Sequence, residues 1–425
     1  MGMDRLEPRH FLRELFEAAV AAAQPELTLP AALPSPPPGR TVVIGAGKGA
    51  AQLARVFERH WTGPFEGFVV TRYGFGVSCE KVEVAEAGHP VPDEAGLCAA
   101  EKMMSMVADL GPDDLVIALL CGGGSALLPL PPDGFSLSDE QVLAETLLRS
   151  GMPIGGMNTV RKHFSRIKGG RLAQAAAPAR VVSLVVSDVP GDDPAEVASG
   201  PTIPSHTTRA DALDWLRRYD VALPEGLQRA LEEAEEAPRP DDPDFRRHEV
   251  SLLSSAGKSL EAAAGLAEKI GLPAVILSDS MEGEARELGR THAAIAREVA
   301  LRGRPFRSPV VLLSGGEATV TLRGKGRGGP NGEFLLALAL ELEGVEDVSA
   351  LAADTDGIDG SERNAGAFAD ARTLSRIRAG GHDPQEFLLS NDSWTAFAAA
   401  GELFEPGPTG TNVNDFRAIL VAARH

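Results

Sequence analysis

A glycine-rich segment near the start of the chain places one lysine where it could act on phosphate. Gly45, Gly47 and Gly49 surround Lys48 and follow the β-branched run at residues 42–44. A tight strand-to-helix turn presents backbone N–H groups at the positive end of a helix, which favours phosphate binding. Lys48 adds a mobile cation, so the turn is a candidate for phosphoryl transfer. The alternative is a structural turn with an exposed lysine.

The same segment fits the dinucleotide-binding spacing G-x-G-x-x-A, which ends at Ala50. A nicotinamide cofactor requires an acidic residue at the end of the second strand, where it binds a ribose hydroxyl. The second predicted strand ends instead at Thr71 and Arg72. This weakens the NAD interpretation, although Arg72 would tolerate the 2′-phosphate of NADP. The sequence contains no Walker A motif either.

A second glycine loop follows the apolar run Leu115–Leu120. Backbone without side chains can approach an anion closely, and consecutive N–H groups can surround it. A nucleophile elbow is excluded, because Leu127 stands where that motif requires glycine. We expect a loop that binds phosphate or carboxylate, with a structural turn as the alternative. Its residues are Gly122, Gly123, Gly124 and Ser125.

Positive charge gathers in one predicted helix, residues 158–173, of a chain whose formal net charge is −19. Side chains spaced by four and seven positions lie on adjacent stripes of a helix. We expect Arg161 and Lys168 to bind a substrate carboxylate or phosphate. A solvated basic face is the alternative.

Acidic residues follow the predicted strand at 181–187. Asp188 stands directly after this strand, and a carboxylate in that position suits a Mg²⁺ ligand or a general base in phosphoryl transfer. Asp192 is a further candidate metal ligand, although its neighbours Pro190 and Gly191 also favour a plain turn.

The second half of the chain contains two more glycine loops. One follows the predicted strand at 310–314, and the other is the basic loop at 324–333. The basic loop is typical of a lid, and its Arg327 could reach a transferring phosphate. We expect nucleotide or phosphate contacts from Gly315, Gly316, Glu317 and Asn331.

Two polar segments follow near the C-terminus. Asp354, Asp356 and Asp359 have a spacing similar to a calcium loop, but Asp359 occupies the position that requires glycine. We reject an EF-hand and retain Asp356 as a candidate metal ligand. The loop at 409–415 precedes a last buried strand, and its Asn414 is a candidate substrate contact.

Predicted strands and helices alternate through most of the chain, which indicates an α/β fold with a mainly parallel sheet. An acidic, proline-rich stretch at 232–243 predicts an exposed connector. We expect a doubly wound, Rossmann-like domain over 1–240 and a second α/β domain with a mixed sheet over 245–425. Strands are predicted at 318–323 and 418–422, among others.

Composition limits the classes of protein that fit. The net charge of −19 excludes a nucleic-acid partner, and it requires an anionic substrate to meet locally gathered cations. No apolar stretch approaches the ~20 residues that span a bilayer, and the start of the chain does not fit a signal peptide. The three cysteines have no metal-ligand or disulfide spacing, so we expect a cytoplasmic protein.

The motifs taken together resemble the class II glycerate kinases, which join a DUF4147 region to a MOFRL region. The resemblance covers nearly the whole chain. It is found in the segments VIGAGKGA, EAGHPVPDEAG, CGGGSALL, MNTVRKHFSRIKGGRLA, SDVPGDDPAEVASGPT, SGGEATVTLRGKGRGG, ADTDGIDG and TGTNVNDF. It implies phosphorylation of D-glycerate by ATP and Mg²⁺, usually to 2-phosphoglycerate, in a cleft between the domains, and it makes Lys48 the catalytic candidate.

One segment departs from this family. Many members have G-G-R-N-Q-E where this chain has Pro330 and Gly332 in place of the arginine and the glutamine. Arg327 is therefore our substitute for the family's arginine. Two other functions remain open, an NAD(P)-dependent hydroxypyruvate reductase and a non-catalytic sensor of sugar acids or nucleotides. We expect a monomer or a homodimer.

Overall fold

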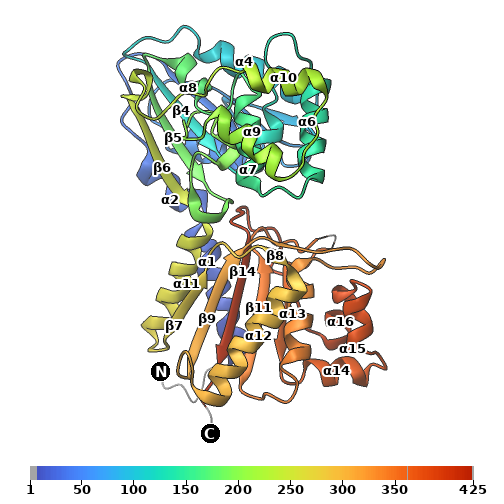
Figure 1. Ribbon diagram of the computed structural model, residues 1–425. Helices are drawn as coiled ribbons and strands as arrows, with labels where there is room; N and C mark the ends of the chain where they lie inside the picture. The colour runs from blue at the N-terminus through green and yellow to red at the C-terminus, as the bar shows by residue number, and fades with distance from the viewer. Residues whose placement is uncertain (1–6, 361, 424–425) are drawn as a thin grey trace. The chain divides into compact units, whose positions relative to one another are not determined.

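The computed structural model describes residues 7–360 and 362–423, and these form two compact units (Figure 1). The first unit comprises Pro25–Val189 and Asp193–Leu253. The second comprises the described residues up to Gln24, the short segment Pro190–Asp192, and the chain from Ser254 onwards. Each unit has its own sheet and its own buried core.

The first unit is built on a six-stranded sheet in the order β3-β2-β1-β4-β5-β6. All pairings from β3 to β5 are parallel. In this order the chain reverses direction across the sheet between β1 and β4, which makes the carboxyl ends of these two strands the expected ligand site. The strands are β1 (Thr41–Ala46), β2 (Glu66–Arg72), β3 (Val82–Ala87), β4 (Leu115–Leu120), β5 (Arg180–Val186) and β6 (His248–Ser254).

Helices cover this sheet because β1 and β4 are buried on both faces and must pack on each side. One of the helical predictions is wrong. The chain at 158–173 is two helices, because Gly169 and Gly170 adopt φ angles of +64° and +87° that no helix contains. The helices are α2 (Pro25–Ala32), α3 (Ala50–His60), α4 (Glu94–Val107), α5 (Gly124–Leu127), α6 (Leu137–Arg149), α7 (Ile154–His163), α8 (Arg171–Ala176), α9 (Arg209–Arg218) and α10 (Glu225–Glu233).

The second unit contains a mixed sheet in the order β13-β12-β11-β14-β9-β7. Only the β7–β9 pairing is parallel among these described strands. The strands are β7 (Ala274–Ser278), β9 (Val310–Gly316), β11 (Val348–Asp354), β12 (Gly366–Asp370), β13 (Leu403–Phe404) and β14 (Asp415–Val421). The α/β class with one parallel and one mixed sheet is confirmed.

Successive side chains of β9 point to opposite faces of this second sheet, and they show which helices cover each face. Val310 and Leu312 join the core beneath α12 and α13, whereas Val311 and Leu313 join the core beneath α1 and α11 (Figure 1). A small parallel pair joins β8 (Gly283–Glu284) to β10 (Ala318–Thr319). The helices are α1 (Pro8–Ala22), α11 (Ala256–Lys269), α12 (Ala285–Arg302), α13 (Pro330–Glu341), α14 (Thr373–Ala379), α15 (Pro384–Leu389) and α16 (Ser393–Ala400).

The first helix of the chain, α1, packs on the second sheet rather than the first. Phe16 meets Phe404 and Phe416 edge to face, with ring centroids 5.0 and 5.8 Å apart. Conversely, the segment after the acidic connector joins the first sheet as β6. The two units therefore divide the chain at different places from the sequence-based ranges.

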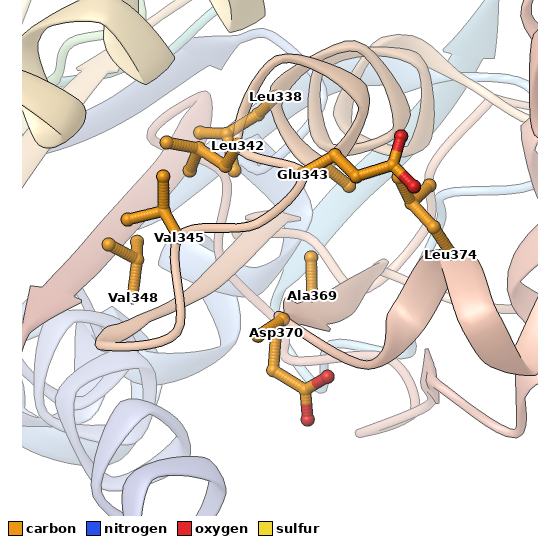
Figure 2. A pocket seen from close by; sticks show the side chains of 10 residues that line it. Leu338, Leu342, Glu343, Val345, Val348, Ala369, Asp370 and Leu374 are labelled. Carbon is orange, nitrogen blue, oxygen red and sulfur yellow. The ribbon is translucent and has the colours of Figure 1, made fainter.

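One apolar pocket in the second unit lies at the end of the sheet away from the polar loops. Figure 2 shows that Val348, Leu338 and Leu374 line it, beside Asp370. Val348 begins β11, whereas Asp354 ends this strand and the candidate residue Asp356 follows it. We therefore assign this pocket no part in the candidate site. Within residues 7–360 and 362–423, no helix is both long and apolar enough to cross a membrane.

Candidate active site

The two glycine loops of the first unit meet at the carboxyl ends of the neighbouring strands β1 and β4. The Lys48 N–H donates to the Gly122 carbonyl at 2.8 Å, and the Gly49 N–H donates to the Cys121 sulfur at 3.1 Å. Gly47 adopts a φ of +130°, and a side chain there would overlap Cys121. These contacts hold the backbone of both loops at the carboxyl edge of the sheet, where α/β proteins bind ligands.

Asp188 approaches the second glycine loop from the end of β5. A Cβ on Gly122 would overlap the Asp188 carboxylate, so this glycine is required for the close approach. Burial raises the pKa of Asp188 above its usual value, while the charge of Lys48 opposes this shift. The structure therefore brings Lys48, the second glycine loop and Asp188 together.

A histidine that the sequence analysis did not select lies beside these residues. A Cβ built on Gly123 would lie 3.1 Å from Nε2 of His89 and 3.2 Å from Cγ of Lys48. Burial, together with the charges of Lys48, Arg72 and Arg161, lowers the pKa of His89 to about 4. Three cations thus surround this part of the loop in an otherwise acidic protein.

Arg161, a predicted substrate contact, is held by a hydrogen-bonded chain of side chains. Its guanidinium donates to Asn158 Oδ1 at 3.2 Å, and the Ser199 hydroxyl donates to the same oxygen at 3.0 Å. Ser199 also lies 2.8 Å from the hydroxyl of Ser125 in the glycine loop. Burial lowers the pKa of Arg161, an effect that Glu140 opposes. Asn158 therefore links Arg161 to Ser125.

The segment that supplies Ser199 has an unusual backbone. Ala198 and Ser199 both have positive φ angles, +55° and +58°, which residues with a Cβ rarely adopt. Such conformations persist where the surrounding structure imposes them, and they are frequent near functional sites. Here a Cβ on Gly124 would lie 2.6 Å from Cβ of Ala198, so the strained segment packs directly on the glycine loop. The sequence contained no pattern that predicts this conformation.

Lys168, the second predicted substrate contact, lies inside the protein. It is 1% exposed, and its ammonium donates to Glu140 Oε1 at 2.7 Å and to the Leu128 carbonyl at 2.9 Å. An ammonium with these two partners has a structural function. Lys162, itself buried, pairs with the partly buried Glu196 at 2.5 Å. Both acids lie outside the basic segment, so the segment resembles an unpaired positive face when its own residues are considered alone.

The remaining predicted contacts belong to the second unit. Gly315 and Gly316 end β9, and a side chain on Gly316 would overlap the backbone of Met281, whose N–H donates to the Gly315 carbonyl at 3.0 Å. Glu317 is exposed. Asp192 belongs to this unit, whereas Asp188 belongs to the first. The second unit thus has its own close-packed glycine turn.

Asn331 lies in the first turn of α13 within a buried polar network. Asp359 accepts hydrogen bonds from the backbone N–H groups of Asn331 and Gly332 at 3.0 and 2.9 Å. The Asn331 amide donates to Asp415 Oδ1 at 2.6 Å, and Asp415 is paired with Arg417. Burial raises the pKa of Asp359 to about 7 against the opposing effect of its hydrogen bonds. In the sequence analysis Asp359 served only to reject a calcium loop, because it occupies a position that requires glycine.

Asp356 and Asn414 lie in adjoining turns after β11 and before β14. The Asp356 N–H donates to Asp354 Oδ1 at 2.9 Å, and the Asn414 carbonyl accepts from the Thr355 N–H at 3.1 Å. Burial raises the pKa of Asp354 well above its usual range, and the charges of Asp356 and Asp415 raise it further. Carboxylates are thus concentrated at this end of the second sheet.

Arg327 lies on the exposed basic loop, and its side chain is engaged. Its guanidinium carbon lies 4.0 Å from the ring centre of Trp394, and Nη2 donates to the Thr395 hydroxyl at 3.3 Å. The Arg327 N–H also donates to Asp392 Oδ1 at 3.0 Å. In this arrangement the loop is anchored to α16.

No group of three or more His, Cys, Asp or Glu side chains in the described ranges is arranged to hold a metal ion. The predicted ligands Asp188, Asp192 and Asp356 therefore form no preassembled metal centre. Mg²⁺ often retains water and binds through one or two carboxylates together with substrate phosphates. Asp188 fits that pattern as a single carboxylate beside the second glycine loop.

Comparison with known proteins agrees with this architecture. Residues 11–232 match the model of a domain of unknown function, DUF4147, and residues 310–415 match the MOFRL family. A protein of Agrobacterium vitis, provisionally named hydroxypyruvate reductase, is 49% identical over 99% of this chain and 96% of its own. The D-glycerate 2-kinase of Thermotoga maritima is 40% identical over 95% of both chains.

Solved structures give the same result. The crystal structure of a glycerate kinase from Thermotoga maritima matches with a TM-score of 0.86 at 38% identity, over 97% of this chain and 99% of that one. The protein is an α/β kinase with two glycine loops at the switch point of a Rossmann-like sheet. The chain belongs to the DUF4147/MOFRL family, the class II glycerate kinases.

Proposed function

We propose that the protein transfers the γ-phosphoryl group of ATP to the 2-hydroxyl of D-glycerate, giving 2-phospho-D-glycerate and ADP. The relative that is a named D-glycerate 2-kinase supports this substrate and this position. The principal structural observation is the hydrogen bond that joins the Lys48 turn to the Gly122 carbonyl. It holds the backbone of Lys48 against the second glycine loop at one edge of the sheet.

Charge stabilisation explains how these residues would act. Phosphoryl transfer requires little covalent help from a protein, so catalysis depends on positioning and on neutralising the charge of the phosphoryl oxygens. Lys48 would supply that neutralisation, and Gly122–Ser125 would bind the phosphate through backbone N–H groups. Arg161 would bind the carboxylate of the acid. In the second unit Arg327 is the corresponding candidate, with Gly316, Glu317 and Asn331 as further nucleotide contacts and Asn414 as a substrate contact.

Asp188 is the proposed acceptor of the hydroxyl proton or the ligand of Mg²⁺. Its pKa is raised by burial, which favours proton uptake, and the ammonium of Lys48 counteracts that shift. When bound with the nucleotide, Mg²⁺ would neutralise phosphate charge. Asp192 and Asp356 are the additional ligands we propose for it.

An NAD(P)-dependent hydroxypyruvate reductase is the second candidate, because a close relative has that provisional name. Arg72 ends β2 where an NAD enzyme requires an acid, and this arginine also contributes to the positive charge around His89. This arrangement favours a phosphate-rich ligand over the ribose of NAD.

One pair of assays distinguishes the candidates. Purified protein is incubated with ATP, Mg²⁺ and D-glycerate while ADP release is followed, and separately with NADH and hydroxypyruvate while NADH oxidation is followed. ADP release that requires D-glycerate supports the kinase, and ³¹P NMR of the product identifies the phosphorylated hydroxyl. NADH oxidation without ADP release would establish the reductase, and ligand binding with neither reaction would establish a sensor.

A further inference from the structure

His89 occupies a position that neither the motifs nor the proposed chemistry has used. It follows β3 and precedes α4, and Nε2 of its ring faces Gly123 of the phosphate-binding loop. The Lys48 side chain passes the same point, because the position of a Cβ on Gly123 lies 3.1 Å from the imidazole and 3.2 Å from Cγ of Lys48. The loop backbone, the lysine and the imidazole therefore border one small volume.

The hydrogen-bonding state of this ring differs from that of two other histidines. His248 bonds the Ser183 hydroxyl at 3.0 Å, and His292 bonds the Ser314 hydroxyl at 2.9 Å. Among the described residues, neither ring nitrogen of His89 has a hydrogen-bond partner, although the residue is only partly exposed. A partly buried imidazole without a protein partner is available to a ligand.

The surrounding charge determines which ligand suits it. Burial disfavours a positive charge on the ring, and Lys48, Arg72 and Arg161 disfavour it further, so the imidazole is neutral near pH 7. A neutral imidazole has one N–H donor, and it can bind an anion without adding to the repulsion among the three cations. The same three cations attract anions.

We propose that His89 is a phosphate-binding residue, whose Nε2–H donates a hydrogen bond to the terminal phosphate of the nucleotide held over Gly123. This inference rests on the proposed kinase function and adds a contact to its phosphate-binding loop. It predicts that a neutral hydrogen-bond donor contacts the phosphate among the cations. The sequence motifs indicate only lysine and backbone N–H groups as phosphate contacts.

Binding measurements test this contact without requiring turnover. Titration calorimetry compares ATP and adenosine on the wild type, His89→Leu, His89→Gln and the exposed control His206→Leu. We expect His89→Leu to weaken ATP binding about 10- to 100-fold while adenosine binding stays unchanged, because a hydrogen bond to a charged group is lost. His89→Gln, whose amide can donate from a similar position, should recover most of the loss, and His206→Leu should behave as the wild type.

A spectroscopic measurement covers the case in which His89→Leu does not fold. In ¹⁵N-histidine-labelled wild-type protein, saturating ATP should shift the Nε2 resonance that His89→Gln lacks. Wild-type ATP affinity in His89→Leu, or an unshifted resonance, would overturn the inference. If ATP shifts the resonance but D-glycerate yields no ADP, the kinase function fails while the His89 contact stands. If D-glycerate is phosphorylated but ATP leaves the resonance unshifted, the kinase function stands and the His89 contact fails.

Discussion

The carboxylate of Asp188 lies so close to the backbone of Gly122 that a methyl group on the glycine would occupy the same space. The two residues come from the ends of neighbouring strands, β5 and β4. A glycine at this position therefore sets the distance between the carboxylate and the second glycine loop. The consequence is a requirement for glycine that does not depend on its φ angle.

Gly122→Ala should abolish most activity by displacing Asp188 or the loop. We expect kcat/KM to fall at least 10²-fold, as a misplacement of about 1 Å near the reacting groups can cost that much. The matched control is Gly155→Ala in α7, where an added Cβ has no atom within 4 Å. That variant should retain activity and gain up to about 1 kcal/mol of stability. Wild-type kinetics in Gly122→Ala would contradict the proposed placement.

Lys48→Ala tests the charge-neutralising function directly. We expect kcat to fall by about 10²–10⁴-fold with an unchanged circular dichroism spectrum, because the ammonium stabilises charge in the transition state. Lys81→Ala, on an exposed position, is the control. ADP release with saturating D-glycerate measures both variants, and near-normal turnover in Lys48→Ala would refute the mechanism.

Lys168→Met should act on stability and leave substrate affinity unchanged. Lys168 is buried against Glu140, and removing one partner of a buried ion pair costs about 3–5 kcal/mol. The thermal midpoint should therefore fall, while the KM for D-glycerate stays within about twofold. The double variant Lys168→Met/Glu140→Leu should recover much of the loss, because no buried charge remains. A raised KM with normal stability would restore Lys168 as a substrate contact.

Asp359 should make the second unit less stable as the pH rises. Its folded-state pKa of about 7 lies above the ordinary value of 3.8, so the folded protein retains the proton more tightly. The raised pKa contributes fully to the free energy of unfolding below about pH 4. This contribution is lost progressively up to about pH 7, and the free energy of unfolding changes by on the order of 4 kcal/mol. Asp359→Asn should flatten the fall in thermal midpoint between pH 5 and 7.5, whereas the exposed control Glu346→Gln should not.

The sequence predicted the buried strands well, because continuous apolar runs bounded by glycine have few alternatives. Leu115–Leu120 coincides with β4, and the strand predicted at 310–314 lies within β9. The strand predicted at 318–323 is shorter, since only Ala318–Thr319 pairs with β8. Beyond it the Thr321 N–H is bound by the Glu284 carboxylate at 3.1 Å and is lost to any ladder.

The candidate site was predicted only in part, for reasons that differ between residues. Lys48 and Gly122 stand in glycine loops whose pattern is visible in one dimension. Asn158 and His89 contribute through contacts with segments far along the chain, and no local pattern records such contacts. Lys168 was misjudged because its partner Glu140 stands 28 positions away.

The packing of α1 on the second sheet gives the order of synthesis a consequence. Leu12 and Phe16 share a core with Leu260 and Phe416, which the ribosome adds hundreds of residues later. At about 5–20 residues per second, this amphipathic helix waits tens of seconds for its partners. During that interval the nascent chain exposes the apolar face of α1. We therefore expect chaperones that bind emerging polypeptides to recognise this segment.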